Sequence, residues 1–173
     1  MPILLINKAK VAEKLQVAIG YSDMEFNAFI NEAQEFDFKP LVQEDFYFDL
    51  LAKKADAPYV ELIDGGNYDY KGRTYNFQGI ATVLSYFAFA RFKLNSSAVS
   101  TSHGFVVKTT PNSEPLSLAE RKNDYYEKQR QANLMMEDVV KFIQRNITDY
   151  PSWNASQNCN SVTSNGFKTK VIQ

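Results

Sequence analysis

The chain has 173 residues and a formal net charge of −1, which suits one domain with a hydrophobic core and excludes a nucleic-acid binder that relies on overall charge. Hydrophobic residues make up 45% and charged residues 23%, a balance that argues against wholesale disorder and favours a soluble globular protein. The 13 Phe and 10 Tyr are typical of a small core and of surfaces that partners cover.

The N-terminal region predicts three short helices. Asn7 is suited to cap a helix over residues 7–19. Ser22, with a glutamate three residues later, has the spacing of a capping box for a helix over residues 22–36. A third helix is expected from Pro40, because proline at the first turn loses no hydrogen bond.

The helical pattern then gives way to a small hairpin. Pro58 is expected to end the helical region, and a hairpin insertion covers about residues 58–78. Aromatic residues alternate over residues 68–70 and 73–77, and Gly72 permits the tight connection between the two strands.

Residues 79–94 predict the helix on which the fold depends. Apolar side chains surround it, which indicates burial in a core or at a subunit interface. Ala81, Ser85 and Ala88 form a stripe of small residues where another helix can approach closely. The apolar stretch over residues 80–92 is shorter than the roughly 20 residues that cross a bilayer, so no membrane contact is expected.

The second half of the chain predicts a Ser/Thr-rich loop over residues 95–102, a short strand over residues 105–108 and a long helix. This helix starts with a second capping box, Ser117 to Glu120, and runs to about Asn146. The fold class is therefore mainly α: a helical bundle with a long C-terminal helix, a small hairpin with short strands, and extended termini. The helical domain covers residues 1–150, and residues 151–173 form an extended polar C-terminal arm.

The arm is rich in Ser, Asn and Thr, and four of its side chains are large and apolar. A neighbouring chain could hold these groups, so they are the candidate interface residues: Trp153, Phe167, Val171 and Ile172.

No catalytic, cofactor-binding or metal-binding constellation is recognisable. The single histidine, His103, lies in a Ser/Thr-rich loop without a partner for a catalytic relay, and the single cysteine, Cys159, lies in the polar arm. One Cys and one His cannot make a tetrahedral zinc site. We therefore expect a protein that is not an enzyme, although glycosidase-type chemistry between distant carboxylates stays open.

The two halves of the chain differ in charge. Residues 1–70 hold 6 Lys/Arg and 13 Asp/Glu, and the excess of basic residues lies in residues 71–173. This asymmetry fits copies that meet acidic half to basic half, as in a head-to-tail ring. It fits equally well a fold that intermixes the two sets.

The order of these elements resembles that of the head–tail connector (adaptor) proteins of tailed bacteriophages, over roughly residues 20–153. The residues that carry the resemblance are Phe77-Gln78-Gly79-Ile80, Ser85-Tyr86-Phe87-Ala88-Phe89-Ala90-Arg91-Phe92 and Thr101-Ser102-His103-Gly104-Phe105-Val106-Val107-Lys108.

The resemblance implies a virion protein, made in the host cytoplasm, that forms a ring, usually a dodecamer, below the portal protein. The ring would continue the channel for genomic DNA without sequence-specific binding and would dock other neck and tail proteins. A small helical DNA-binding or regulatory protein is the alternative.

Overall fold

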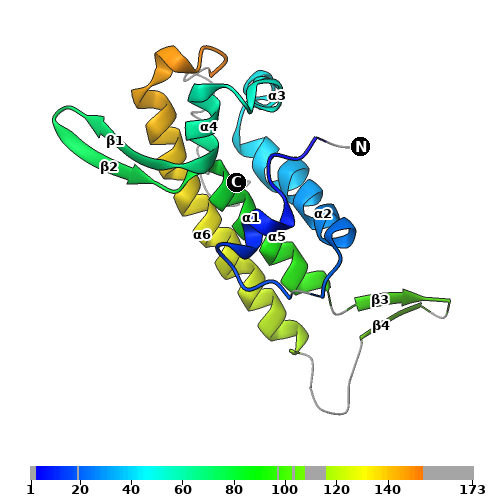
Figure 1. Cartoon of the computed structure of the whole chain (residues 1–173). Coiled ribbons are helices and arrows are strands. Elements are labelled where there is room, and N and C mark those ends of the chain that lie inside the picture. The colour runs from blue at the N-terminus through cyan, green and yellow to red at the C-terminus, as the bar shows by residue number, and fades with distance from the viewer. Residues whose placement is uncertain (1–2, 19, 97, 103, 108–115, 154–173) are drawn as a thin grey trace, which may run out of the picture.

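A central helix, α5 (Gly79–Asn95), organises the computed structural model, which describes residues 3–18, 20–96, 98–102, 104–107 and 116–153 (Figure 1). The fold is mainly helical, as expected. The other elements, in chain order, are α1 (Lys8–Ala12), α2 (Asp23–Glu32), a π-helix (Ala33–Phe38), a 3-10 turn (Lys39–Leu41), α3 (Glu44–Lys53), α4 (Ala57–Asp64), β1 (Gly66–Tyr70), β2 (Arg73–Phe77), β3 (Ala98–Thr101), β4 (Gly104–Val107), α6 (Leu118–Arg145) and a 3-10 turn (Ile147–Asp149).

Other helices enclose α5 on several sides. It contacts α6 along much of its length, and α1, α2, α4 and the π-helix pack on the remaining faces. From Gly79 to Ala90 every side chain except that of Tyr86 is therefore buried. The apolar circumference of this helix, which predicted burial, is explained by these contacts within one chain.

The stripe of small residues on α5 is buried, and α1 lies close to it. Ala81 and Ser85 line a narrow cleft whose other wall carries residues of α1 and of the segment that follows it. The Ser85 hydroxyl donates to the Ala81 carbonyl at 2.7 Å, so this polar group costs little when buried. Asn7 caps α1 as predicted, but the helix ends at Ala12, because a helix this short depends on packing and the chain must turn towards α2.

The chain between α2 and α3 differs from the prediction. Ser22 caps α2, but after Glu32 the helix widens into a π-helix, which continues to Phe38. Pro40 lies in the 3-10 turn that follows, and α3 begins only at Glu44. The prediction that Pro40 starts the third helix is therefore wrong.

Pro58 has the role that was expected for Pro40. It lies in the first turn of α4, where its missing N–H leaves no hydrogen bond unmade. The hairpin insertion accordingly begins at Gly66 and not at about residue 58. A proline can follow the end of a helix or lie in its first turn, and the residues around Pro40 and Pro58 do not show which of these applies.

The predicted β1–β2 hairpin is present. Tyr68 pairs with Tyr75 and Tyr70 with Arg73, which leaves the two-residue loop Lys71-Gly72. Both loop residues have positive φ, 51° and 75°, as a type I′ turn requires.

The hairpin is joined to α5 through a close backbone contact between Gly65 and Gly79. Gly79 has φ +74°, and a Cβ atom there would lie 2.4 Å from the Gly65 nitrogen. A Cβ on Gly65 would lie 2.5 Å from the carbonyl carbon of Gln78. Only glycine fits on either side, so this contact fixes where the hairpin leaves the helical body.

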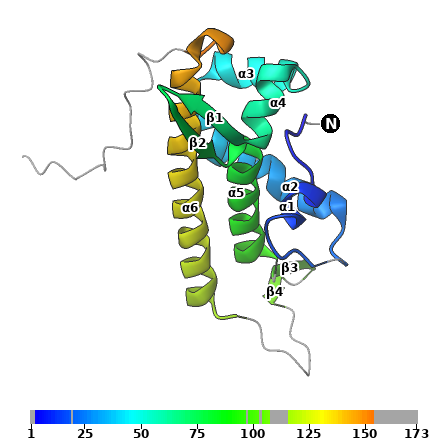
Figure 2. The same ribbon diagram turned by 60° about the vertical axis from the view of Figure 1, so that its left-hand side comes forward.

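A second hairpin, β3–β4, follows the other end of α5. Its strands pair from Ala98 with Val107 to Thr101 with Gly104. The predicted strand over residues 105–108 is confirmed as β4 within the described residues, but the predicted loop over residues 95–102 contains β3. The two hairpins lie at opposite ends of α5, and their tips extend beyond the helices (Figures 1 and 2).

α6 packs beside α5 in two chemically different halves. Its capping box, Ser117 with Glu120, is formed as predicted. Its C-terminal half buries Ala132, Met136, Val139, Phe142 and Ile143. Its N-terminal half contacts α5 through polar groups: Lys93 with Asp124, the Arg121 guanidinium with the Leu94 carbonyl, and the Lys128 ammonium over the Tyr86 ring.

We predict that Gly79→Ala destabilises the fold by about 3–5 kcal/mol, because the new Cβ collides with backbone atoms and the backbone conformation is also strained. Gly72→Ala is the matched control, since Gly72 has φ +75° but no heavy atom near the new Cβ. It should cost only about 1–2 kcal/mol. Urea unfolding measures both values. If the two variants lose the same free energy of unfolding, the backbone contact does not have this role.

Candidate assembly surface

Among the described residues, no group of three or more His, Cys, Asp or Glu side chains is placed to hold a metal ion. Within the same part of the chain, no helix is long and apolar enough to cross a membrane. His103 and Cys159 lie outside the described residues. The next features are the four candidate interface residues and the exposed surfaces that a partner could contact.

Of the four candidate interface residues, the structure describes only Trp153. Its side chain is 3% exposed and packs inside its own chain, with ring centroids 4.9 Å from Phe46. This differs from the expectation of a contact with a neighbour, because a buried ring has little surface to offer. Phe167, Val171 and Ile172 lie outside the described residues, and their interface role stays a prediction.

Trp153 and Tyr150 attach the end of α6 to α3 and α4. The Tyr150 hydroxyl donates to the Pro58 carbonyl at 2.7 Å, and burial raises the pKa of that hydroxyl above its ordinary value. The Trp153 indole nitrogen is buried without a hydrogen-bond partner among the described residues. Tyr150 and Trp153 therefore pack with the helical body of their own chain.

An arginine on α6 clamps the β1–β2 hairpin. The Arg145 guanidinium lies 4.0 Å from the Tyr75 ring centroid and 4.8 Å from that of Tyr70. It also donates to the Tyr68 hydroxyl at 2.7 Å. At the base, the Phe77 ring stacks on Phe142 with centroids 4.0 Å apart. An isolated two-stranded hairpin is marginal in water, so these contacts hold it in one direction.

The two faces of this hairpin have different chemistry. The aromatic face lies against α6, and the outer face carries polar pairs across the strands. Asn76 donates to the Asn67 side chain at 2.8 Å, and Thr74 donates to Asp69 at 2.6 Å. The tip, Lys71-Gly72-Arg73, is exposed.

The π-helix connects three other parts of the molecule. Gln34, which is 1% exposed, accepts from the Leu5 N–H at 2.9 Å and donates to the Tyr47 hydroxyl at 2.9 Å. Tyr47 in turn donates to Glu35 at 2.7 Å. Burial and then the bond to Glu35 raise the pKa of Tyr47 to about 12.

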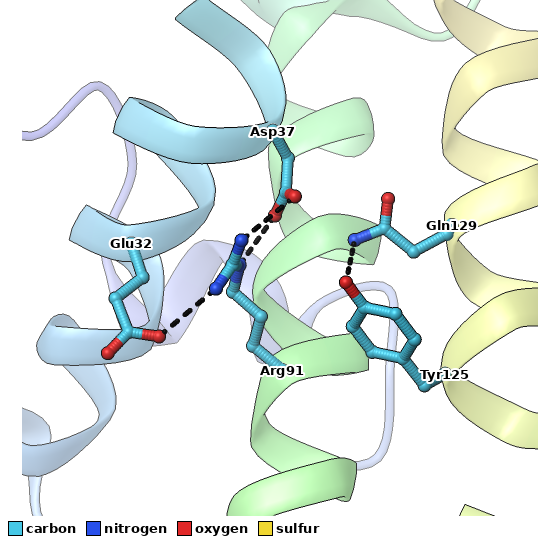
Figure 3. A network of polar contacts seen from close by, with 5 residues as sticks. All are labelled: Glu32, Asp37, Arg91, Tyr125 and Gln129. Carbon is cyan, nitrogen blue, oxygen red and sulfur yellow. Dashed lines mark hydrogen bonds and ion pairs between the residues drawn. The ribbon is translucent and has the colours of Figure 1, made fainter. Parts of the chain in front are cut away.

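The same π-helix carries the acid that pairs with α5. Figure 3 shows Arg91 between Asp37 and Glu32, with Tyr125 of α6 nearby. Arg91 binds Asp37 with two hydrogen bonds, at 2.6 and 3.0 Å, and Glu32 at 3.3 Å. The bonds to Asp37 raise the pKa of Arg91 above its ordinary value. Here a basic residue of the second half of the chain neutralises acids of the first half, so the two sets are partly intermixed.

Several aromatic side chains are exposed beside these networks. Phe36 on the π-helix is 68% exposed, Phe48 on α3 is 52% exposed and Tyr126 on α6 is 65% exposed. The Arg91 guanidinium lies 5.6 Å from the Phe36 ring, and the Lys39 ammonium 5.2 Å from the Phe48 ring.

An open pocket of about 470 Å³ lies between the N-terminal segment and α4. Leu5, Ile6 and Ile63 contribute apolar walls, and Lys10 and Asp64 at the rim form an ion pair at 3.1 Å. Lys54 also lines the pocket and donates to the Leu4 carbonyl, so the three charged side chains of its lining already have partners.

A family model described as a family of unknown function (DUF6712) matches residues 38–163, well over half of the chain. The chain belongs to this family. No curated protein and no solved structure matches. The DUF6712 match begins at the end of the π-helix and includes α3 to α6 with both hairpins, so the clamped hairpin is part of what the family model describes.

Two features of this DUF6712 chain could not be found by inspecting the sequence. Arg145 is 77 positions from Tyr68, and nothing local marks it as the residue that clamps the hairpin. The alternating Tyr residues are a signal that something covers this face of the hairpin, because tyrosine rings on one strand face require a cover. Arginine is suited to that position, since its guanidinium stacks well on such rings. The π-helix has no recognisable sequence signature.

We predict that Arg145→Met loosens the hairpin and lowers the free energy of unfolding by about 1–2 kcal/mol, because cation–π contacts and a hydrogen bond are lost while the aliphatic length is kept. Arg130→Met is the control, because Arg130 forms an exposed ion pair with Glu127 and its loss should lower the free energy of unfolding by less than ~0.5 kcal/mol. NMR of the Tyr68, Tyr70 and Tyr75 rings reports the loosening directly. Unchanged tyrosine shifts would contradict the clamp.

We predict a loss of stability at alkaline pH that involves Tyr47. Its pKa is raised in the folded protein, so its contribution is complete below the ordinary tyrosine pKa near ~10 and is lost as the pH rises towards about 12. Tyr47→Phe should lower stability at neutral pH but flatten the decline above pH ~10. Urea unfolding at several pH values measures this. If the free energy of unfolding falls equally steeply with pH above ~10 in the wild type and in Tyr47→Phe, the assignment is wrong.

Proposed function

We propose that this protein is a structural subunit of a tailed-phage virion, a head–tail connector that forms a ring below the portal. The observation that carries the proposal is the arrangement of the central helix and its two projecting hairpins (Figure 1). The helices bury α5 within one chain, so the protomer can fold before it assembles. The hairpins then offer contacts on both sides of that body. The resemblance in residues 77–92 and 101–108 supports the same proposal.

In this proposal the protein acts by assembly and not by catalysis. Two different surfaces of one protomer meet on neighbouring copies, and such a heterologous contact closes a ring when the rotation per subunit divides a full turn. The exposed aromatic side chains Phe36, Phe48 and Tyr126 supply the apolar area that such interfaces bury. The partners in this proposal are further copies of the chain in the ring, the portal protein above it, and other neck and tail proteins below it.

Genomic DNA would pass through the ring without sequence-specific contact. A dodecamer is the proposed copy number, and the virion is the proposed location. Both the copy number and the location are what the resemblance implies.

We predict that the purified protein, mixed with the portal protein of the same phage, forms rings that electron microscopy shows on the portal. The protein alone should have the mass of a monomer or of a closed ring by mass photometry. A protein that neither assembles alone nor binds the portal, but binds duplex DNA tightly as a monomer, would overturn the proposal in favour of a DNA-binding protein.

A further inference from the structure

The tip of the β1–β2 hairpin is basic and has no ion-pair partner among the described residues. Lys71 and Arg73 are both exposed, and Lys71 contacts only the Tyr70 ring, at 5.2 Å. Arg145 and the backbone contact of Gly65 with Gly79 fix the direction of the hairpin. Because the tip is held before any partner arrives, binding would cost little conformational entropy.

The complementary charge lies on α3 and α4. Residues 44–64 hold six carboxylates and only two lysines. Asp49 pairs with Lys53, and Asp64 pairs with Lys10. The other four carboxylates have no ion-pair partner within the described part of the chain: Glu44, Asp45, Asp56 and Glu61.

The start of α3 combines this charge with an exposed aromatic ring. Glu44, Asp45 and Phe48 are all exposed, and Glu44 and Phe48 are four residues apart on one helix face. A carboxylate pair beside a phenyl ring is suited to an arginine or lysine, which can form an ion pair and lie over the ring together. One cation already lies beside this face: the Lys39 ammonium is 5.2 Å from the centroid of the Phe48 ring and pairs with Glu35, not with Glu44 or Asp45.

We propose that the hairpin tip of one copy, with Lys71 and Arg73, docks on the start of α3 of a second copy, at Glu44, Asp45 and Phe48. This inference rests on the proposed function and names the contact that would close the ring. In Figure 1 the hairpin projects to the left at the upper end of the molecule, and α3 lies at the same end, beyond α4. Different surfaces make a heterologous contact, which joins copies head to tail.

A charge-swap experiment tests this contact. One variant carries Lys71→Glu and Arg73→Glu, and the other carries Glu44→Lys and Asp45→Lys. Each alone should lose self-association by at least about tenfold, because like charges then meet at the contact. An equimolar mixture should regain it, because each acidic tip finds a basic face and each basic tip finds an acidic face.

Lys14→Glu with Lys122→Glu is the matched control, since both lysines are exposed, lie away from the hairpin and change the net charge as the hairpin variant does. It should associate like the wild type. Mass photometry and sedimentation velocity at low ionic strength measure association, and circular dichroism confirms that each variant is folded.

The outcomes separate the contact from the proposed function. Wild-type rings that persist in the hairpin variant, or a mixture that does not recover, overturn the contact and leave the connector proposal in place. A hairpin variant that loses only duplex DNA binding overturns it in favour of a nucleic-acid surface. A wild type that never associates also overturns the contact, and binding to the portal then tests the connector proposal independently.

Discussion

Enclosure of α5 is the constraint on which the rest of the molecule depends. Its side chains are apolar on every face, so each face requires a cover, and α1, α2, α4, α6 and the π-helix supply one each. Because one chain provides all of these covers, the helical body needs no partner to bury its core. What projects from that body, above all the hairpin at each end of α5, is then available for contacts between molecules (Figure 2).

Polar networks pair the charged side chains at the edge of the apolar body. Arg91 lies where α5 leaves its apolar surroundings, and Asp37 of the π-helix binds it with two hydrogen bonds. The Arg91 side chain is partly buried, and the two bonds to Asp37 compensate the guanidinium for the water that it loses there. The widened turn of the π-helix presents Gln34, Glu35 and Asp37 to three different elements. A single irregular turn therefore connects the N-terminal segment, α3 and α5.

Local sequence signals predicted much of this fold, and long-range contacts account for what they missed. Ser117 and Glu120 identified the start of α6 because a capping box is a contact between near neighbours. The sequence predicts the end of a helix at Pro58, whereas Pro58 lies in the first turn of α4, because proline is tolerated at both positions. Trp153 was expected at an interface, but its place beside Phe46 depends on the path of the chain after α6. The hairpin was predicted from its tyrosines, whereas its clamp on Arg145 was not.

One chain thus encloses α5 and fixes the direction of the β1–β2 hairpin before assembly. Hydrogen exchange on the monomer at low concentration tests it most directly. The amides of residues 83–90 should exchange only through global unfolding, and the amides of β1 and β2 that are hydrogen-bonded across the hairpin should also be protected in the monomer. Rapid exchange of α5 in the monomer, with protection gained only on oligomerisation, would contradict the account.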